Sequence, residues 1–231
     1  MNIAAISDLH GDLRIDLPKN LDYLFIAGDI VPLRYQTYSK VSKDWFEDEF
    51  LTWCMDQGII KNVFIVAGNH DFYLERHGDE FKKNMYDMSD GKIIYLDNEL
   101  WENDDLVVYG TPLCKVFGNW AFMIPQEKIK EEFDKVPIFP NTKPSFILSH
   151  DAPYGVSDVL LQKDCRWADG SHIGNKALRE LIERTKPDYN LHGHLHSTNH
   201  DVEMLGNTEI RCVSILNEDY KVAYEPAILT V

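Results

Sequence analysis

Histidine, aspartate and asparagine side chains recur in five short clusters along the chain. Their imidazole nitrogens and carboxylate or amide oxygens suit divalent ions such as Mn, Fe or Zn, and no cysteine takes part. Asp8 and His10 are two residues apart, so both face one side of an extended segment, and His194 and His196 repeat that spacing. The pattern predicts a metal site. The five clusters are Asp8-Leu9-His10, Gly28-Asp29, Gly68-Asn69-His70-Asp71, His150-Asp151 and His192-Gly193-His194-Leu195-His196.

Two of these residues suggest that more than one ion binds. Asp29 can bridge two cations through its two carboxylate oxygens, and Asn69 offers a neutral oxygen that completes a second metal without adding charge. Taken singly, each cluster has an ordinary explanation as a surface loop, a solvated strand or a turn. Five such clusters, each following a strand-like run, favour one shared site instead.

Each cluster follows a short apolar run that is typical of a buried strand. The runs are rich in Val, Ile and aromatic residues and are too short for helices. Strands of an open α/β sheet bring the loops at their carboxyl ends to one crevice, so the five clusters are expected to meet in space. The runs are residues 3–6, 23–27, 63–67, 146–148 and 189–191.

Helix-like segments lie between these runs, and the alternation favours an α/β fold. Residues 92–97 and 105–110 are expected to form adjacent strands, and residues 207–231 to add antiparallel strands. We find no internal repeat or linker, so a single domain over residues 1–231 is expected. The apolar stripes at helical spacing are Val41, Trp45, Phe50 and Trp53 within residues 39–56, and Ala177, Leu178, Leu181 and Ile182 within residues 174–185.

The composition narrows the classes of partner. The chain has 231 residues with 38 acidic and 23 basic side chains, a formal net charge of −15, which disfavours coating of extended nucleic acid. Its four cysteines form no CxxC pair, as expected for free thiols in a reducing compartment. The first residues have no basic segment, and no apolar run approaches the ~18 residues that span a bilayer. A cytoplasmic protein without membrane contact is expected.

The order Asp-x-His, Gly-Asp, Gly-Asn-His-Asp, an isolated His and Gly-His-x-His resembles that of the calcineurin-like metallophosphoesterases, from residue 8 to residue 196. The resemblance implies a two-sheet β-sandwich flanked by helices, with the metal site at the carboxyl ends of the strands. It also implies that His70 is a catalytic residue that binds no metal. The implied ligands are Asp8, His10, Asp29 and His196 for one metal and Asp29, Asn69, His150 and His194 for the other.

A phosphoesterase mechanism follows from this resemblance. Two cations about 3.5–4 Å apart clamp a phosphate and lower the pKa of a bridging water to near neutrality, and the resulting hydroxide attacks phosphorus. His70 stabilises the transition state or protonates the leaving oxygen. Asp71 either orients His70 or caps a surface helix. The ligands suit two divalent or mixed-valence ions, with Mn or Fe favoured and Zn, Ni or Co also suitable.

Secondary motifs favour a phosphodiester over a phosphomonoester. Protein phosphatases of this superfamily carry a GDxVDRG pattern, whereas residues 28–33 read GDIVPL and lack its Asp-Arg pair. Residues 110–112, 117–122, 149–153 and 170–174 resemble the small metallophosphatase-domain-containing, phosphodiesterase-like proteins, some of which hydrolyse phosphodiesters. The segment His150-Asp151-Ala152-Pro153 departs from their commoner His-Gly-Pro-Pro.

Loops 111–122 and 162–173 are expected to select the substrate. Arg166, Trp167 and His172 are candidate substrate contacts, Arg166 to a phosphate oxygen and Trp167 to a base or ring. An ordered loop with Trp167 packed on the core is the alternative. A small phosphate ester is the expected partner, and the sequence does not determine the oligomeric state. Two other functions stay open, a catalytically weak metal-binding scaffold and a nuclease of the same superfamily.

Overall fold

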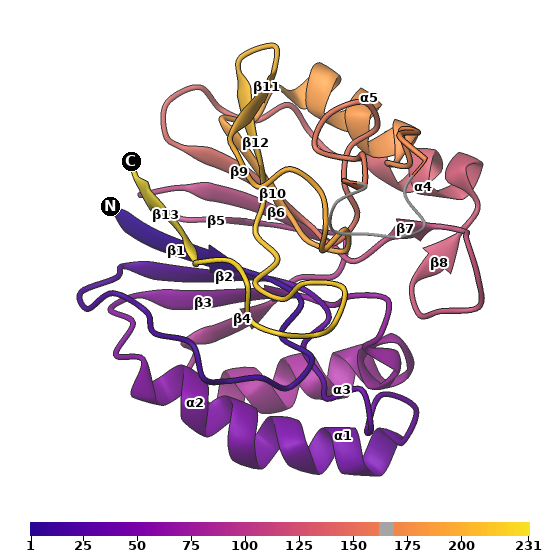
Figure 1. The fold of residues 1–231 in the computed structure, drawn as a ribbon. Coiled ribbons are helices and arrows are strands. Elements are labelled where there is room, and N and C mark those ends of the chain that lie inside the picture. Colours follow the sequence, from indigo (N-terminus) through magenta and orange to yellow (C-terminus); the bar gives the residue numbers. More distant parts are fainter. Residues whose placement is uncertain (162–168) are drawn as a thin grey trace.

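Two larger β-sheets face each other in the computed structural model, which describes residues 1–161 and 169–231 (Figure 1). The first sheet has the strand order β13-β1-β2-β3-β4, in which β13 is antiparallel to β1 and the other neighbours are parallel. Its strands are β1 (Asn2–Ile6), β2 (Tyr23–Ala27), β3 (Asn62–Val66), β4 (Ile93–Tyr95) and β13 (Ala227–Thr230).

The second sheet has the order β11-β12-β10-β9-β6-β5, with four parallel strands between antiparallel edges. A short parallel pair, β7 (Cys114–Lys115) and β8 (Met123–Ile124), lies beside it. The strands of the second sheet are β5 (Glu99–Glu102), β6 (Val107–Thr111), β9 (Ser145–Ser149), β10 (Tyr189–His192), β11 (Glu203–Leu205) and β12 (Thr208–Cys212).

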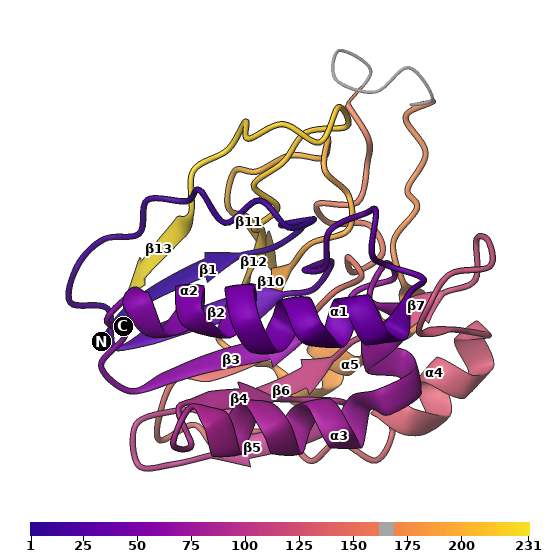
Figure 2. The same cartoon turned by 90° about the horizontal axis from the view of Figure 1, so that it is seen from below.

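Helices cover the outer face of each sheet. Figures 1 and 2 show α1, α2 and α3 along the first sheet, with α4 and α5 on the opposite side of the molecule beside the second sheet. Among the described residues, no helix is both long enough and apolar enough to cross a bilayer. The helices are α1 (Ser39–Trp45), the π-helical turn η1 (Phe46–Phe50), α2 (Leu51–Asp56), α3 (Phe72–Met88), α4 (Gln126–Phe133) and α5 (Lys176–Thr185).

The apolar core between the sheets follows from the two-residue period of the strands. Along β1, Ile3 and Ala5 face the second sheet, whereas the intervening Ala4 and Ile6 pack against the helices. The Phe25 ring meets the Phe146 ring of the second sheet at a centroid distance of 5.1 Å, edge to face. This intersheet core holds the two sheets in register at the edge where their loops converge.

The predicted α/β class, with two sheets flanked by helices, is confirmed, and each of the five apolar runs lies in or against a strand. The stripe proposed for residues 39–56 is only partly right. Trp45 and Phe50 are buried and stack at 5.8 Å, but Val41 is 41% exposed. Trp45 and Phe50 are five positions apart, and the wider π-turn η1 brings them to one face, which the 3.6-residue period does not describe.

The prediction of adjacent strands at residues 92–97 and 105–110 is wrong. β4 pairs with β3 in the first sheet, while β6 pairs with β5 and β9 in the second. The chain crosses between the sheets after Tyr95, and both segments are apolar because each lines an interior. Antiparallel additions after residue 207 are confirmed for β13, whereas β12 runs parallel to β10.

Candidate metal centre and active site

The predicted ligands lie just beyond the carboxyl ends of parallel strands in both sheets. Asp8, Asp29 and Asn69 follow β1, β2 and β3, and His150 and residues 194–196 follow β9 and β10. The first three therefore belong to one sheet and the histidines at residues 150–196 to the other. Their side chains meet where the two sheets come together.

The turns that carry these side chains have strained backbones. Asp8, His10, Asp29 and His194 have φ values of 56°, 42°, 51° and 71°, in the left-handed region that such residues rarely adopt. Backbone hydrogen bonds hold two of these turns together, from Asp8 N to Gly28 O at 3.0 Å and from His10 N to Asp29 O at 2.9 Å. Strain of this kind persists where the surroundings fix it and is concentrated at functional sites.

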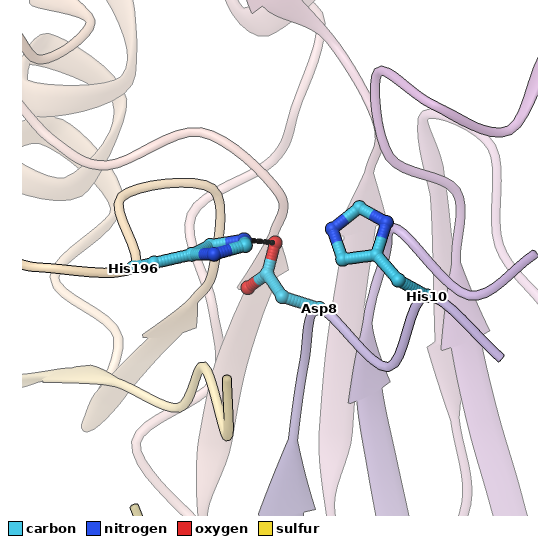
Figure 3. Close-up of side chains that lie close together, drawn as sticks. All are labelled: Asp8, His10 and His196. Carbon is cyan, nitrogen blue, oxygen red and sulfur yellow. Dashed lines mark ion pairs between the residues drawn. The ribbon is translucent and has the colours of Figure 1, made fainter. Parts of the chain in front are cut away.

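One group of potential ligands consists of Asp8, His10 and His196. Each offers a ligand atom within 4.8 Å of the others. His196 Nε2 lies 3.3 Å from Asp8 Oδ1, and Figure 3 shows the Asp8 carboxylate between the two imidazole rings. A single cation can therefore reach all three side chains.

A second group consists of Asp8, Asp29 and His150. His150 Nε2 lies 3.4 Å from Asp29 Oδ1 and 3.0 Å from the Asn69 side-chain oxygen. The other oxygen of Asp29 lies 3.7 Å from His10 Nε2. Asp29 thus faces a histidine of each group with a different oxygen, as a bridging carboxylate does, and Asp8 is shared by both groups.

His194 joins the cluster through its backbone and its ring. Its N–H donates to both oxygens of Asp8 at 3.2 and 3.1 Å. Its ring centroid lies 5.1 Å from that of His150. Burial lowers the pKa of His194 to about 3, so the imidazole is neutral and its nitrogens can bind a metal.

The buried polar atoms of the cluster fit a cationic occupant. Neither ring nitrogen of the buried His10 imidazole has a hydrogen-bond partner, and burial lowers the pKa of this side chain to about 4. Asp8 and Asp29 are buried side by side, and in the described part of the chain no lysine or arginine pairs with either. Two buried carboxylates need compensating positive charge, which divalent ions held by these side chains would supply.

Two histidines provide that charge when no ion is bound. Burial alone would lower the pKa of His150, but the Asp29 carboxylate outweighs it and raises the pKa to about 10. For His196, burial is likewise outweighed by Asp8, and the pKa rises to about 9. The cluster therefore holds protons at neutral pH that metal ions would displace.

His70 lies at the edge of the cluster with its ring fixed on one side. Its Nδ1 pairs with the Gln36 side-chain oxygen at 2.5 Å, its backbone N–H donates to Asp29 at 2.7 Å, and its Nε2 lies 3.9 Å from Asp29 Oδ2. The ring also packs against Trp120 at a centroid distance of 4.6 Å. An amide oxygen only accepts, so Nδ1 carries a proton and Nε2 faces the cluster.

The cluster opens into a cavity of about 190 Å³. Its polar wall comprises Asp29, Asn69, His70, His194 and His196. Three aromatic side chains and one carboxylate complete the lining, namely Phe117, Trp120, Tyr220 and Glu218. Loop 111–122 contributes Phe117 and Trp120 to this lining, and its expected role in selecting the substrate stays a prediction.

The Asp71 carboxylate hydrogen-bonds to neither the His70 ring nor the first turn of α3. Its buried carboxylate accepts hydrogen bonds from the backbone N–H groups of Ile30, Val31 and Gly68 at 2.8–3.2 Å, whereas the His70 ring pairs with Gln36. It occupies the N-cap position of α3 without a side-chain capping bond. Asp71 ties the turn after β2 to the turn after β3, which no local pattern reveals.

Of the remaining predicted substrate contacts, His172 belongs to the described residues. Arg166 and Trp167 lie outside the described residues. His172 is half exposed, and its Nδ1 pairs at 2.6 Å with the buried Asp158 carboxylate. None of the described cavities that hold metal-cluster side chains is lined by His172.

Sequence reasoning missed Gln36, Ser214, Glu218 and Tyr220. Ser214 Oγ donates a short hydrogen bond to Asp8 Oδ2, and Glu218 and Tyr220 line the cavity. These residues belong to no recurring motif and reach the site from loops far away in sequence. Only the folded chain identifies them.

Comparisons with known proteins agree with this geometry. A family model described as calcineurin-like phosphoesterase matches residues 1–198. The chain is 26% identical over 183 residues to the UPF0046 protein C25E10.12 of Caenorhabditis elegans, covering 74% of this chain and 62% of that protein. It is 24% identical over 140 residues to the UPF0046 protein T07D4.2 of the same organism, covering 60% and 32%. The chain spans less than two thirds of these two relatives.

Solved structures share the fold at low sequence identity. The protein TT1561 of Thermus thermophilus superposes with a TM-score of 0.60 and 15% identity, covering 91% of this chain and 88% of that one. The phosphopantetheinyl hydrolase PptH of Mycobacterium tuberculosis has a TM-score of 0.53 and 15% identity, covering 93% and 89%. At these identities the likeness concerns the fold.

Proposed function

The chain belongs to the calcineurin-like phosphoesterase family, a family of hydrolases, and from this premise we propose that it hydrolyses a small phosphodiester at a centre of two divalent metal ions. One observation carries the proposal. The buried Asp29 carboxylate faces His10 with one oxygen and His150 with the other, inside a cluster in which no lysine or arginine of the described residues pairs with a carboxylate. Manganese or iron is the favoured ion, and zinc, nickel or cobalt also suits these ligands.

The proposed ligands divide between two positions. Asp8, His10, Asp29 and His196 would hold one ion, and Asp29, Asn69, His150 and His194 would hold the other. Bound ions supply Lewis-acid stabilisation of the phosphate and lower the pKa of coordinated water. The strained turns keep the ligand atoms close before any ion binds, so little reorganisation is needed.

His70 is the proposed proton donor to the leaving oxygen. Its Nδ1 pairs with Gln36, so Nε2 is the ring nitrogen that faces the proposed phosphate position beside Asp29 and would donate the proton. Trp120 packs on the ring and restricts its rotation. The His70 side chain therefore acts from the cavity wall without being a metal ligand.

The charge of the cavity supports a diester. Among the residues that line it in the described part of the chain, none is lysine or arginine. A phosphodiester carries one negative charge and a monoester up to two, so a cavity lined by no lysine or arginine among the described residues suits the diester. The net charge of −15 is consistent with a small substrate and weighs against a nuclease.

Hydrolysis of bis-p-nitrophenyl phosphate and p-nitrophenyl phosphate by manganese-loaded protein tests the proposal. We expect faster turnover of the diester. His70→Ala should retain its metal content and lose about 10²–10⁴-fold in kcat, as is usual when a general acid is removed. Asn69→Ala should lose one of the two ions. Turnover of neither ester by fully loaded protein would favour a metal-binding scaffold, and turnover of the monoester alone would refute the diester preference.

A further inference from the structure

We propose that residues 214–222 form a recognition loop and that Tyr220 binds a planar aromatic substituent of the phosphate ester. This inference rests on the proposed function, because it concerns the substrate of the same site. The proposed substrate class is an ester with an aryl or comparable flat ring, and Tyr220 is the residue that selects it. The recognition loop also lies beyond residues 1–198, the segment that the family model matches.

The recognition loop is anchored directly on the metal cluster. Ser214 forms an isolated parallel bridge with Ser7, and its hydroxyl donates to Asp8 Oδ2. His196 Nδ1 lies 3.1 Å from the backbone oxygen of Asn217. These contacts fix the loop to the residues after β1 and to one of the proposed ligands.

A tight turn within the recognition loop presents Tyr220 to the site. The Asn217 side-chain oxygen accepts the N–H groups of Asp219 and Lys221 at 3.0 and 3.1 Å, and Tyr220 N donates to Asn217 O at 2.8 Å. Tyr220 has a φ of 57°, where glycine would be free of strain and a bulky residue is not. A strained position that carries a large aromatic ring is consistent with a role for the ring itself.

The Tyr220 ring stands over the proposed ligands of one metal. Its centroid lies 4.9 Å from that of His10 and 5.6 Å from that of His196, nearly perpendicular to both rings. The side chain is nevertheless 44% exposed. One face of an aromatic ring is thus available beside the place where a phosphate would bind.

Two further aromatic side chains extend this rim around the cavity. Trp120 lies beside His70, and Phe117, which is 50% exposed, lies 5.1 Å from the His194 ring. Exposed aromatic rings around a buried polar centre favour a ligand with a charged head and a flat apolar body, because stacking on such rings stabilises planar groups.

The volumes of the cavity and of the hollow next to it indicate where a substituent of the phosphate ester would lie. The cavity of about 190 Å³ is smaller than the roughly 300–1,000 Å³ typical of small-molecule sites, so an ester substituent must extend out of it. Tyr220 also lines an adjoining hollow of about 570 Å³ together with His10, Pro32 and Leu33. A substituent that leaves the phosphate on the His10 side therefore passes along the Tyr220 ring.

Binding of phenylphosphonate and methylphosphonate to manganese-loaded protein, measured by calorimetry, tests this assignment without turnover. The two ligands share the phosphonate and differ in the ring. The unsubstituted protein should bind phenylphosphonate at least about ten-fold more tightly, a difference of about 1.4 kcal/mol and within the range of aromatic stacking. Tyr220→Ala should abolish this preference by weakening phenylphosphonate binding about ten-fold more than methylphosphonate binding, whereas Tyr220→Phe should keep it. Tyr38→Ala is the matched control, since Tyr38 is 64% exposed and lines none of these hollows.

The outcomes separate the two proposals. Equal weakening of both phosphonates by Tyr220→Ala would show that Tyr220 positions the metal ligands and would refute its role in recognition. An unsubstituted protein without preference for the phenyl ligand would refute the aromatic substrate class. If diesters are not hydrolysed but the phenyl preference depends on Tyr220, the recognition loop stands and the catalytic proposal fails. Diester turnover without a preference for the phenyl ligand would support the catalytic proposal and refute the recognition loop.

Discussion

At the scale of single residues, the glycines beside the ligands explain why the motifs have their form. A Cβ on Gly68 would lie 2.2 Å from Asp29 N and Oδ1, and one on Gly193 would lie 2.0 Å from Ser7 Oγ and 2.5 Å from Asp8 Oδ2. These distances are far below van der Waals contact. The residue before Asn69 and the residue before His194 must therefore lack a side chain for the clusters to approach each other.

Replacement of Gly193 tests this close approach. Gly193→Ala should push Asp8 away from His194, lower the metal content of the purified protein, and reduce the free energy of unfolding by about 1–3 kcal/mol, as overpacking usually does. Metal analysis and urea denaturation measure the two effects. Gly78→Ala is the control, because its Cβ would meet Tyr95 at an ordinary 3.6 Å. Full metal content in Gly193→Ala would contradict the steric explanation.

The residues that bear the chemistry differ in how far the sequence reveals them. All seven predicted ligands converge on one edge of the molecule, because each follows a strand whose carboxyl end is fixed by the α/β topology. Gln36 and Tyr220 escape prediction because they touch the site through loops whose paths depend on tertiary packing. Asp71 is visible in the motif, but its partners at residues 30–31 are not, since they belong to another turn.

At the scale of elements, Asp71 joins the turns after β2 and β3. Its carboxylate accepts hydrogen bonds from three buried backbone N–H groups. Burial raises its pKa to about 7, with the nearby Asp29 charge acting in the same direction. The turn geometry at Asp29 and Asn69 therefore depends on a residue that is not itself proposed to bind metal.

Removing this carboxylate should destabilise the protein. Asp71→Ala leaves buried donors without acceptors, and each such donor costs about 1–3 kcal/mol, so we expect a loss of about 3 kcal/mol in the free energy of unfolding. Asp71→Asn keeps one acceptor oxygen and should lose less. Urea denaturation of the metal-free proteins measures both. Equal stability of the Ala variant and the unsubstituted protein would show that the turns hold without Asp71.

Element prediction succeeded where a run is short, apolar and closed by a polar cluster, as in β1, β2 and β10. It failed where chain connectivity decides the partner. β4 and β6 are close in sequence but lie in different sheets, because β5 intervenes and forms a hairpin with β6. Helix α3 was also not predicted, because Gly78 interrupts its helical sequence pattern. The backbone of α3 has non-helical torsions at the neighbouring His77.

At the scale of the whole molecule, the protonated histidines make the stability of the metal-free protein depend on pH. The folded-state pKa values of His150 and His196 are about 10 and about 9, above the ordinary value of 6.5. A raised pKa stabilises the fold fully below the unfolded value, and this stabilisation is lost as the pH rises through the folded value. It therefore decreases from about pH 6.5 toward pH 9–10.

The melting temperature of metal-free protein should consequently fall between pH 7 and pH 9. Metal-loaded protein should lose much less over the same range, because a metal ion replaces the second proton of each imidazole and the ring is already neutral. Differential scanning calorimetry with and without chelator measures both curves. Parallel curves would show that these two histidines do not hold protons in the metal-free fold.

The intersheet core has a consequence for which ion the protein prefers. The Asp29 carboxylate is fixed to the first sheet and the His150 imidazole to the second, and the contact between Phe25 and Phe146 sets the separation of the two layers. The packing of the core therefore determines the distance between ligand atoms on the two sheets, and ions of different radius fit different distances. Replacement of Phe25 or Phe146 by a smaller side chain should shift the order of affinity among Mn, Zn and Ni, although no ligand is changed. The selectivity of the proposed metal centre would then depend on the hydrophobic interior as much as on the histidines.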